Sequence, residues 1–373
     1  MNTLQCGGGA EKVAVSLAIC LKVLFRIDLR IVYIWNEPDS DQEIGSFIDS
    51  KYLPALLDKH GIEHKWLGKR PNSGKRGIIT VFKNLRDHIR DYKPHIVHSH
   101  CFHPDFFNAL LPHKALRVRT LHNQIYAMKG EKLLEYGIFA HRFRANVAVA
   151  SSLKELWEGK TLAPASRMFF ISNPIGRCFF EEARLRHSCP RVPRLGLVGR
   201  MVKQKGHIYA LEFLERLHEQ GVPSHLYLAG GGNLEKSLRN YVRERGIRGV
   251  HFLGPLSEQE VFELYHKLDI LLVPSLWEGF NLTAYEAAAT GLPVLGTDVV
   301  GLKDLLQETD GNSFPPQDIE AMCEAFWNLY KNSKTYQTQS QKGIQYTQKL
   351  TEKNIAQDYH RLYQNLYSSV NRT

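Results

Sequence analysis

The sequence predicts an α/β protein built from two doubly wound domains that face a central cleft. The chain has 373 residues, which exceeds one ordinary core and suits two domains of about 150 to 200 residues each. Short β-branched runs alternate with helical patterns in both halves, as layers of parallel sheet and helix require. A polar stretch near the middle separates the two sets of runs. We therefore expect two similar halves joined by one linker.

Each set contains five expected strands. In the first half they lie at residues 30–35, 95–100, 117–121, 146–150 and 168–172. In the second half they lie at residues 194–198, 225–229, 250–253, 270–273 and 293–296. Parallel strands place their carboxyl ends at one edge of the sheet, and folds of this kind bind ligands there.

The domain boundaries follow from the linker and the tail. Residues 181–193, EEARLRHSCPRVP, are polar, contain a Pro-x-x-Pro pair and have little to bury. We therefore expect an N-terminal domain over 1–180 and a C-terminal domain over 194–354. Residues 352–367 carry apolar side chains at helical spacing, which predicts a closing helix with one buried face. We expect this C-terminal helix, about 355–373, to pack back on the first domain.

The composition is that of a globular chain, with 43% hydrophobic and 23% charged residues. The N-terminal apolar stretch, 13–25, is interrupted by Lys22 and is shorter than the roughly 18 residues of a membrane span. No secretory signal is visible. The six cysteines lack CxxC spacing, which argues against a zinc site and a disulfide framework and favours the reducing cytoplasm.

The formal net charge of +10 is confined to the first half of the sequence. Residues 1–190 hold 28 Lys+Arg against 18 Asp+Glu, whereas residues 191–373 hold 20 against 20. This asymmetry indicates an anionic partner on the N-terminal half, such as an acidic acceptor, a membrane surface or nucleic acid. A basic surface that only aids solubility explains it about as well.

The most informative stretch is PSLWEGFNLTAYE at 274–286, in which two carboxylates stand eight residues apart after a buried run. Asn281 is a good N-cap for the helix that follows. The free N–H groups and the positive end of such a helix attract an anion. Glu278 on the loop and Glu286 inside the helix could then hold hydroxyls on either side of a diphosphate, as in a nucleotide sugar. Taken alone, two such glutamates are more often solvated surface charges.

Two cations and a glycine run follow other strands of the second half. Arg200 and Lys205 lie in GRMVKQKG at 199–206, directly after the first strand of that half, where they could neutralise a departing diphosphate without a metal. The glycines at 230–232 mark another close backbone approach, although a flexible turn explains them nearly as well.

The N-terminal half contributes a glycine cluster and a group of histidines. Gly8 and Gly9, before a helix expected from near Lys12, would let the backbone approach a phosphate, and a plain turn is an equal interpretation. His98 and His100 point to one side of a strand end, but no Asp or Glu lies near enough in sequence to complete a metal set. We therefore expect core or cleft-wall histidines.

Together these segments resemble the retaining glycosyltransferases of family four, which have the GT-B fold of two Rossmann-like domains. The resemblance lies in VGRMVKQKGH at 198–207, LAGGG at 228–232, HIVHSH at 95–100 and the stretch 250–298 that includes PSLWEGFNLTAYE. It covers most of the second domain specifically and the first domain more loosely.

The resemblance implies a role for each motif. In the family the glutamates of an E-x7-E motif bind the donor; Glu278 matches the one that holds sugar hydroxyls and Glu286 the one that holds the ribose. Arg200 and Lys205 match a diphosphate clamp, and His122 matches a histidine beside the reacting carbon. The implied catalytic residues are therefore His122, Glu278, Arg200 and Lys205. Donor-binding roles are implied for Gly8, Gly9, Gly254, Pro255, Leu256, Gly279, Phe280, Asn281, Leu282, Thr283 and Glu286.

In the family a strand precedes a loop with the sequence GG-A-E. Residues Gly8 to Glu11 match this loop. Only Met1 to Cys6 remain for this strand, about one short strand's length. Either the strand is shortened or the start of this sequence lies downstream of it.

The resemblance predicts a metal-independent, retaining hexosyltransferase that moves a sugar from a UDP- or GDP-linked donor to a glycan or lipid-linked acceptor. The expected setting is the biosynthesis of cell-surface polysaccharide, lipopolysaccharide or glycoconjugates, without a cofactor or nucleic acid. A sugar-nucleotide epimerase on the same fold and a catalytically silent GT-B scaffold remain as alternatives. A nicotinamide dehydrogenase fits less well, because the glycines of CGGGAEK do not form GxGxxG.

The segment 69–95 combines apolar side chains at heptad-like spacing with a series of lysines and arginines. An ordinary domain helix looks like this, and we favour that interpretation over membrane attachment. Attachment would place a cytoplasmic protein peripherally on the inner face of the cell membrane, beside a lipid-linked acceptor.

Overall fold

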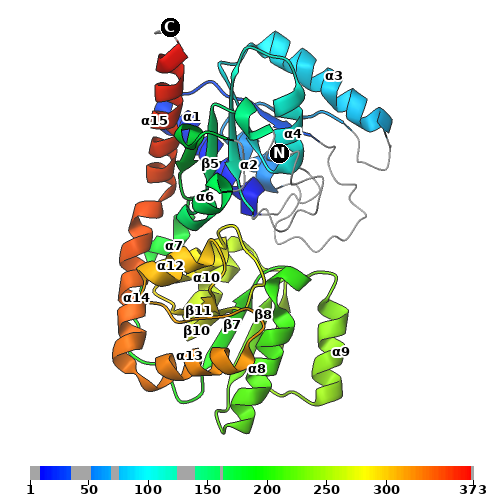
Figure 1. Cartoon of the computed structure of the whole chain (residues 1–373). Helices are drawn as coiled ribbons and strands as arrows, with labels where there is room; N and C mark the ends of the chain where they lie inside the picture. Colours follow the sequence, from blue (N-terminus) through cyan, green and yellow to red (C-terminus); the bar gives the residue numbers. More distant parts are fainter. Residues whose placement is uncertain (1–8, 35–51, 69–74, 124–138, 160–162, 371–373) are drawn as a thin grey trace. The chain divides into compact units, whose positions relative to one another are not determined.

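The computed structural model describes residues 9–34, 52–68, 75–123, 139–159 and 163–370, which form two compact α/β units (Figure 1). The first unit includes the chain up to Pro174 and again from Glu352, and the second spans Ile175–Thr351. The segment expected as a linker, 181–193, lies inside the second unit. Gly8 and the short strand expected at Met1 to Cys6 lie outside the described residues.

The first unit alternates strands and helices. Its strands are β1 (Ile31–Tyr33), β2 (His64–Trp66), β3 (Ile96–His100), β4 (Leu116–Leu121), β5 (Ala145–Ala148) and β6 (Met168–Phe170). Its helices are α1 (Gly9–Phe25), α2 (Tyr52–Lys59), α3 (Lys75–Tyr92), α4 (Phe102–Leu110), α6 (Ser151–Glu158) and α15 (Glu352–Val370), with 3-10 turns at Ala140–Arg142 and Ala165–Arg167. Helix α1 starts before the predicted Lys12, which brings Glu11 into its first turn, where a carboxylate complements the helix dipole.

The strands of the first unit pair in parallel and form two sheets. β3, β4, β5 and β6 make one sheet in chain order, whereas β1 pairs with β2. Within the described ranges, β1 and β3 therefore each leave one edge without a strand partner.

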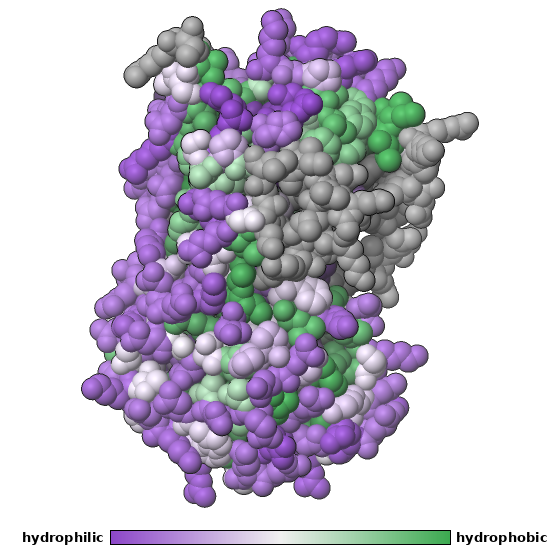
Figure 2. Space-filling model, in the orientation of Figure 1, coloured by the Kyte–Doolittle hydropathy of each residue, from purple (hydrophilic) through white to green (hydrophobic). Residues whose placement is uncertain are grey.

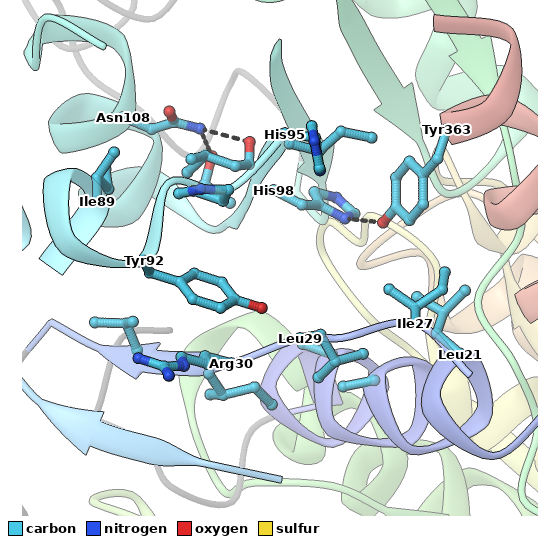
Figure 3. A pocket seen from close by; sticks show the side chains of 18 of the residues that line it. Leu21, Ile27, Leu29, Arg30, Ile89, Tyr92, His95, His98, Asn108 and Tyr363 are labelled. Atoms are coloured by element: carbon cyan, nitrogen blue, oxygen red, sulfur yellow. Dashed lines mark hydrogen bonds between the residues drawn. The ribbon is translucent and has the colours of Figure 1, made fainter. Parts of the chain in front are cut away.

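A cavity of about 700 Å³ is lined by residues of both open edges, including Val32 of β1 and Val97 of β3. Helices α1, α3 and α15 supply further wall. Figure 3 shows His98 and Tyr363 on one side of this cavity and Leu29 on the opposite side. Most of its lining is apolar, so the cavity is an interruption in the core of the unit.

The C-terminal helix α15 is part of the first unit. Its buried side chains are spaced as a helix with one buried face requires, and they include Ile355, Tyr359 and Leu362. The Phe25 ring of α1 stacks on the His360 ring with centroids 4.1 Å apart. Helix α15 thus joins the core of a unit whose preceding element, β6, ends at Phe170, while α15 begins only at Glu352.

The second unit has strands β7 (Arg194–Val198), β8 (His225–Ala229), β9 (Val250–Gly254), β10 (Ile270–Val273), β11 (Val294–Thr297) and β12 (Ser313–Phe314). Its helices are α7 (Cys178–Glu181), α8 (His207–Glu219), α9 (Glu235–Arg245), α10 (Glu258–Lys267), α11 (Leu282–Ala289), α12 (Leu302–Glu308), α13 (Ile319–Lys331) and α14 (Ser333–Thr347), with 3-10 turns at Lys203–Lys205 and Gln348–Leu350.

These six strands form one parallel sheet in the order β12-β11-β10-β7-β8-β9. Ile270 and Leu272 of β10 face a core that α8 and α13 cover, while the alternate residues Leu271 and Val273 are buried on the other face. The strand order reverses between β7 and β10. In open α/β sheets this switch point separates the loops that follow the two strands and creates a ligand site there. The predicted α/β class, with two units built on parallel sheets, is confirmed.

Candidate functional site

The loops that follow β7 and β10 are joined at the switch point of the second unit. The Leu276 amide donates to the Gln204 carbonyl at 2.8 Å, and Gln204 Nε2 donates to the Trp277 carbonyl at 2.9 Å. Gly206 has φ +66°, and a Cβ there would lie 2.0 Å from the Pro274 carbonyl oxygen. Only glycine permits this approach, so the two loops are fixed backbone to backbone.

Glu278 is buried at this junction, with 4% of its surface exposed. Lys205 Nζ donates to Glu278 Oε1 at 2.7 Å, and Asn281 Nδ2 donates to the same oxygen at 2.9 Å. Within the described part of the chain, Oε2 has no hydrogen-bond partner. The carboxylate is therefore held in one orientation with one oxygen left to accept a further hydrogen bond.

Asn281 has two roles at the start of α11. Its Oδ1 accepts from the Ala284 amide at 3.1 Å, which makes it the predicted N-cap, while its Nδ2 bonds Glu278. Its backbone is left-handed, with φ 68°, a conformation that asparagine tolerates better than most residues. This geometry turns one side chain toward both the helix end and the carboxylate.

Glu286 lies in the second turn of α11 and is also 4% exposed. Burial, and then the charge of Glu286, raise the pKa of the Tyr265 phenol well above its usual value. The Tyr265 hydroxyl donates to the Thr283 carbonyl at 3.1 Å. Both glutamates of the motif are thus interior groups, which excludes the interpretation of solvated surface charges.

Gly279 and Phe280 are held by residues that sequence reasoning missed. A Cβ on Gly301 would lie 2.4 Å from the Gly279 carbonyl oxygen, so the chain before α12 approaches the loop closely. Phe280 stacks on Tyr285 with ring centroids 3.8 Å apart, and the Tyr285 hydroxyl donates to the Gly301 carbonyl at 3.2 Å. The only sequence signal was a glycine before the α12 pattern, at a position whose φ is +84°.

Arg200 lies in the loop after β7, and the glycines at 230–232 follow β8. Arg200 is half-buried, and its guanidinium has no ion pair among the residues that the structure describes. The Met201 amide donates to the Gly231 carbonyl at 2.9 Å, and the Gly230 amide donates to the Gly254 carbonyl at 2.7 Å. These bonds connect the loop after β7 to the loop after β8, and the loop after β8 to the end of β9.

Pro255 and Leu256 follow Gly254 at the β9 end, Pro255 exposed and Leu256 half-buried. Leu282 and Thr283 are the first residues of α11. In the described ranges, no hydrogen bond joins residues 254–256 directly to the Glu278 loop.

The remaining predicted residues, Gly9 and His122, belong to the first unit. Gly9 is the first residue of α1. His122 follows β4, and its Nε2 lies 2.9 Å from His100 Nδ1. Burial lowers the pKa of His122 to about 4, so its imidazole is neutral at pH 7. The described residues include no group of three or more His, Cys, Asp or Glu side chains that could hold a metal ion, and none of their helices is both long and apolar enough to cross a bilayer.

Two family models match the chain. The model described as glycosyltransferase family 4 matches residues 7–176, and the model described as glycosyl transferases group 1 matches residues 192–332. A Bacillus subtilis (strain 168) protein named as glycosyltransferase EpsF is 27% identical over 293 residues, which cover 72% of this chain and 75% of that protein. Other curated relatives are matched over about a third to a half of their length.

Solved structures match nearly the whole chain. HepE of Anabaena, crystallised with UDP-glucose, has a TM-score of 0.76 at 16% identity, over 97% of this chain and 98% of HepE. The lipopolysaccharide outer core galactosyltransferase WaaB has a TM-score of 0.71 at 16% identity, over 95% of this chain and 94% of WaaB. With family models on both units and this fold, the protein is a glycosyltransferase of the GT-B type.

Proposed function

We propose that this protein is a retaining, metal-independent glycosyltransferase that transfers a hexose from a UDP- or GDP-linked donor to a glycan or lipid-linked acceptor. The observation that carries the proposal is the Lys205–Glu278–Asn281 network at the switch point. It places a cation, an oriented carboxylate and a helix N-terminus within one corner. A diphosphate matches the cation and the helix N-terminus, and sugar hydroxyls match the carboxylate.

In this proposal the oxygen Oε2 of Glu278 accepts a hydrogen bond from a sugar hydroxyl, and the N–H groups of the residues that follow Glu278 donate to oxygens of the sugar. Glu286 holds the ribose, and Gly254 to Leu256 line the base. Lys205 and Arg200 neutralise the diphosphate as it leaves. HepE, a structural neighbour, was crystallised with UDP-glucose, which supports a nucleotide sugar as donor.

The chemical step is substitution on one face of the sugar. The bond from the anomeric carbon to the diphosphate oxygen breaks, and a bond from the same carbon to the acceptor oxygen forms on the same side. The proton of the acceptor hydroxyl passes to the departing diphosphate oxygen. Because the diphosphate itself takes this proton, catalysis rests on positioning and on charge stabilisation.

The first test is a thermal-shift screen with UDP-glucose, GDP-mannose and ADP-glucose. One donor should raise the melting temperature by mass action, by about 2.7 kcal/mol of stability at 100 times its Kd. Glu278→Gln should abolish both the shift and sugar transfer. The matched control is Glu235→Gln, which removes an exposed ion pair with Arg239 in the same unit. Full transfer by folded Glu278→Gln would refute the proposal, and conversion of donor without acceptor would indicate an epimerase.

We also propose peripheral attachment to the inner face of the membrane through α3. Ile78 and Ile79 are 44% and 67% exposed, and Figure 2 shows hydrophobic surface over the first turns of this helix. Lys83 and Arg86 are exposed further along it. Vesicles rich in phosphatidylglycerol should sediment the protein and phosphatidylcholine vesicles should not. If Ile79→Ser binds the anionic vesicles as well as the parent protein does, α3 is an ordinary domain helix.

A further inference from the structure

Three histidine rings form a layer at the carboxyl ends of β3 and β4 in the first unit. His98 and His100 project from the same face of β3, with ring centroids 4.3 Å apart. The ring of His122, just after β4, stacks on His100 with centroids 5.2 Å apart. His100 is only 7% exposed, so it is enclosed between the other two rings.

His98, at one end of this layer, is held by the C-terminal helix α15. His98 Nδ1 lies 2.6 Å from the Tyr363 hydroxyl, a bond drawn in Figure 3, and His98 Nε2 lies 2.8 Å from Thr120 Oγ1. Thr120 Oγ1 in turn lies 2.9 Å from the Tyr359 hydroxyl. Because both nitrogens of His98 are bonded, its ring cannot turn, and it provides a fixed wall for His100.

The bond between His100 and His122 has a chemical consequence. Burial lowers the pKa of His98 to about 3 and of His122 to about 4, and lowers that of His100 well below its usual value. Each ring therefore carries a single N–H at pH 7. Across the 2.9 Å contact from His100 Nδ1 to His122 Nε2, one nitrogen must donate and the other must accept. Whichever ring donates, the position of the proton on His122 is set by His100.

We propose that His100 is a positioning residue that fixes the ring orientation and tautomer of His122. It thereby determines whether Nδ1 of His122, the nitrogen not bonded to His100, presents a donor or an acceptor to the substrate. His100 does not itself touch the sugar in this scheme. The kinetic part of the inference rests on the proposed function, whereas the tautomer is a property of the folded protein alone.

The tautomer can be read without any substrate. The full chain labelled with ¹⁵N-histidine is recorded at pH 7.5 by long-range ¹H–¹⁵N correlation, and His122 is assigned by the signals lost in His122→Gln. One tautomer is expected in the parent protein. His100→Asn, whose amide lies near the position of Nδ1, should preserve it, whereas His100→Leu should give a mixture. If His100→Leu does not fold, His100→Gln replaces it, because its amide reaches the Nε2 position and leaves His122 unbonded.

The kinetic test uses the donor that gives the largest shift in the thermal screen. His100→Leu should lower kcat about 10- to 100-fold, with the KM for donor within about threefold, since misplacement of a group that contacts the substrate slows the chemical step. His100→Asn should recover most of the loss. The control is His113→Leu, which removes a partly buried histidine bonded to Asn108 before β4 begins, at the other end of that strand.

The outcomes distinguish control of the His122 tautomer from the effect on sugar transfer. A single unchanged tautomer in folded His100→Leu would overturn the inference, as would a changed tautomer with unchanged kcat. A loss of kcat in His113→Leu equal to that in His100→Leu would show a general packing effect and would also overturn it. If the parent protein transfers no sugar from any donor, the proposed function fails, while the tautomer result still decides whether His100 controls His122.

Discussion

The second unit completes one six-stranded parallel sheet, whereas the first divides its described strands between a four-stranded and a two-stranded sheet. In the second unit, β7 is paired on both sides and the core beneath it is continuous. In the first, the open edges of β1 and β3 border a cavity of about 700 Å³. Within the described residues, similar βαβ patterns in the sequence thus lead to one continuous sheet in the second unit and two separate sheets in the first.

This difference is reflected in how each unit supports its polar groups. In the second unit the loops after β7 and β10 hold Lys205, Glu278 and Asn281 together, within 77 residues of chain. In the first unit His98 is supported by α15, which lies 265 residues away at the His98–Tyr363 bond. The second site is therefore built within its own sheet, while the first depends on a distant helix.

The largest expected difference between the units is their response to acid. The pKa values of His98, His100 and His122 are lowered by burial in the folded first unit, so below the unfolded value of about 6.5 the unfolded chain binds protons that the folded chain does not. Stability is therefore lost as the pH falls from about 6.5 toward the folded values of about 3 for His98 and about 4 for His122. From pH 7 to 5.5 His98 and His122 should together cost about 2 to 3 kcal/mol, and His100 acts in the same direction. In the second unit His207, with its pKa lowered to about 4, should cost about 1 kcal/mol.

Amide hydrogen exchange at pH 7 and 5.5, corrected for the intrinsic chemical rate, measures this difference. Protection of β4 and β5 should fall much more than that of β7 and β10. His98→Gln keeps a hydrogen-bonding group but cannot take a proton. It should therefore lower the number of protons that the first unit takes up on unfolding by about one. Equal losses of protection in both units would remove the contrast.

The sequence predicted the strands of the second unit best, because buried central strands are short continuous apolar runs. β7, β8 and β10 have the bounds that were predicted. β2 and β12 were missed: the first reads HKW, which has no apolar alternation, and the second has two residues. The α15 helix was visible from its spacing, but no local signal indicated that it would support β3.

The candidate site was predictable in its residue types and not in its contacts. The capping role of Asn281 follows from local chemistry and is confirmed. The bond between Lys205 and Glu278 joins positions 73 apart in sequence, and it depends on the adjacency of β7 and β10, which the sequence does not specify. The burial of Glu286 beside Tyr265 depends on the packing of α10 against α11 for the same reason. The functional roles of these residues stay predictions.

A smaller difference between the units is expected in the free energy of unfolding when a buried alanine is enlarged. Ala18 of α1 lines the cavity of the first unit, and Ala210 of α8 is fully buried in the core of the second. Ala18→Leu should be neutral or stabilising by up to about 2 kcal/mol, because the added groups enter existing space at about 0.8 kcal/mol per buried CH₂. Ala210→Leu should cost about 1 to 3 kcal/mol through overpacking.

Both alanines lie within helices, and leucine is a good helix former, so helix propensity contributes little to either result. The free energy of unfolding from urea titrations, with equal slopes for parent and variants, isolates the packing effect. A loss in Ala18→Leu as large as in Ala210→Leu would mean that the space between β1 and β3 is filled in solution. The first unit would then have a continuous interior like the second, and its acid sensitivity would follow from the histidines alone.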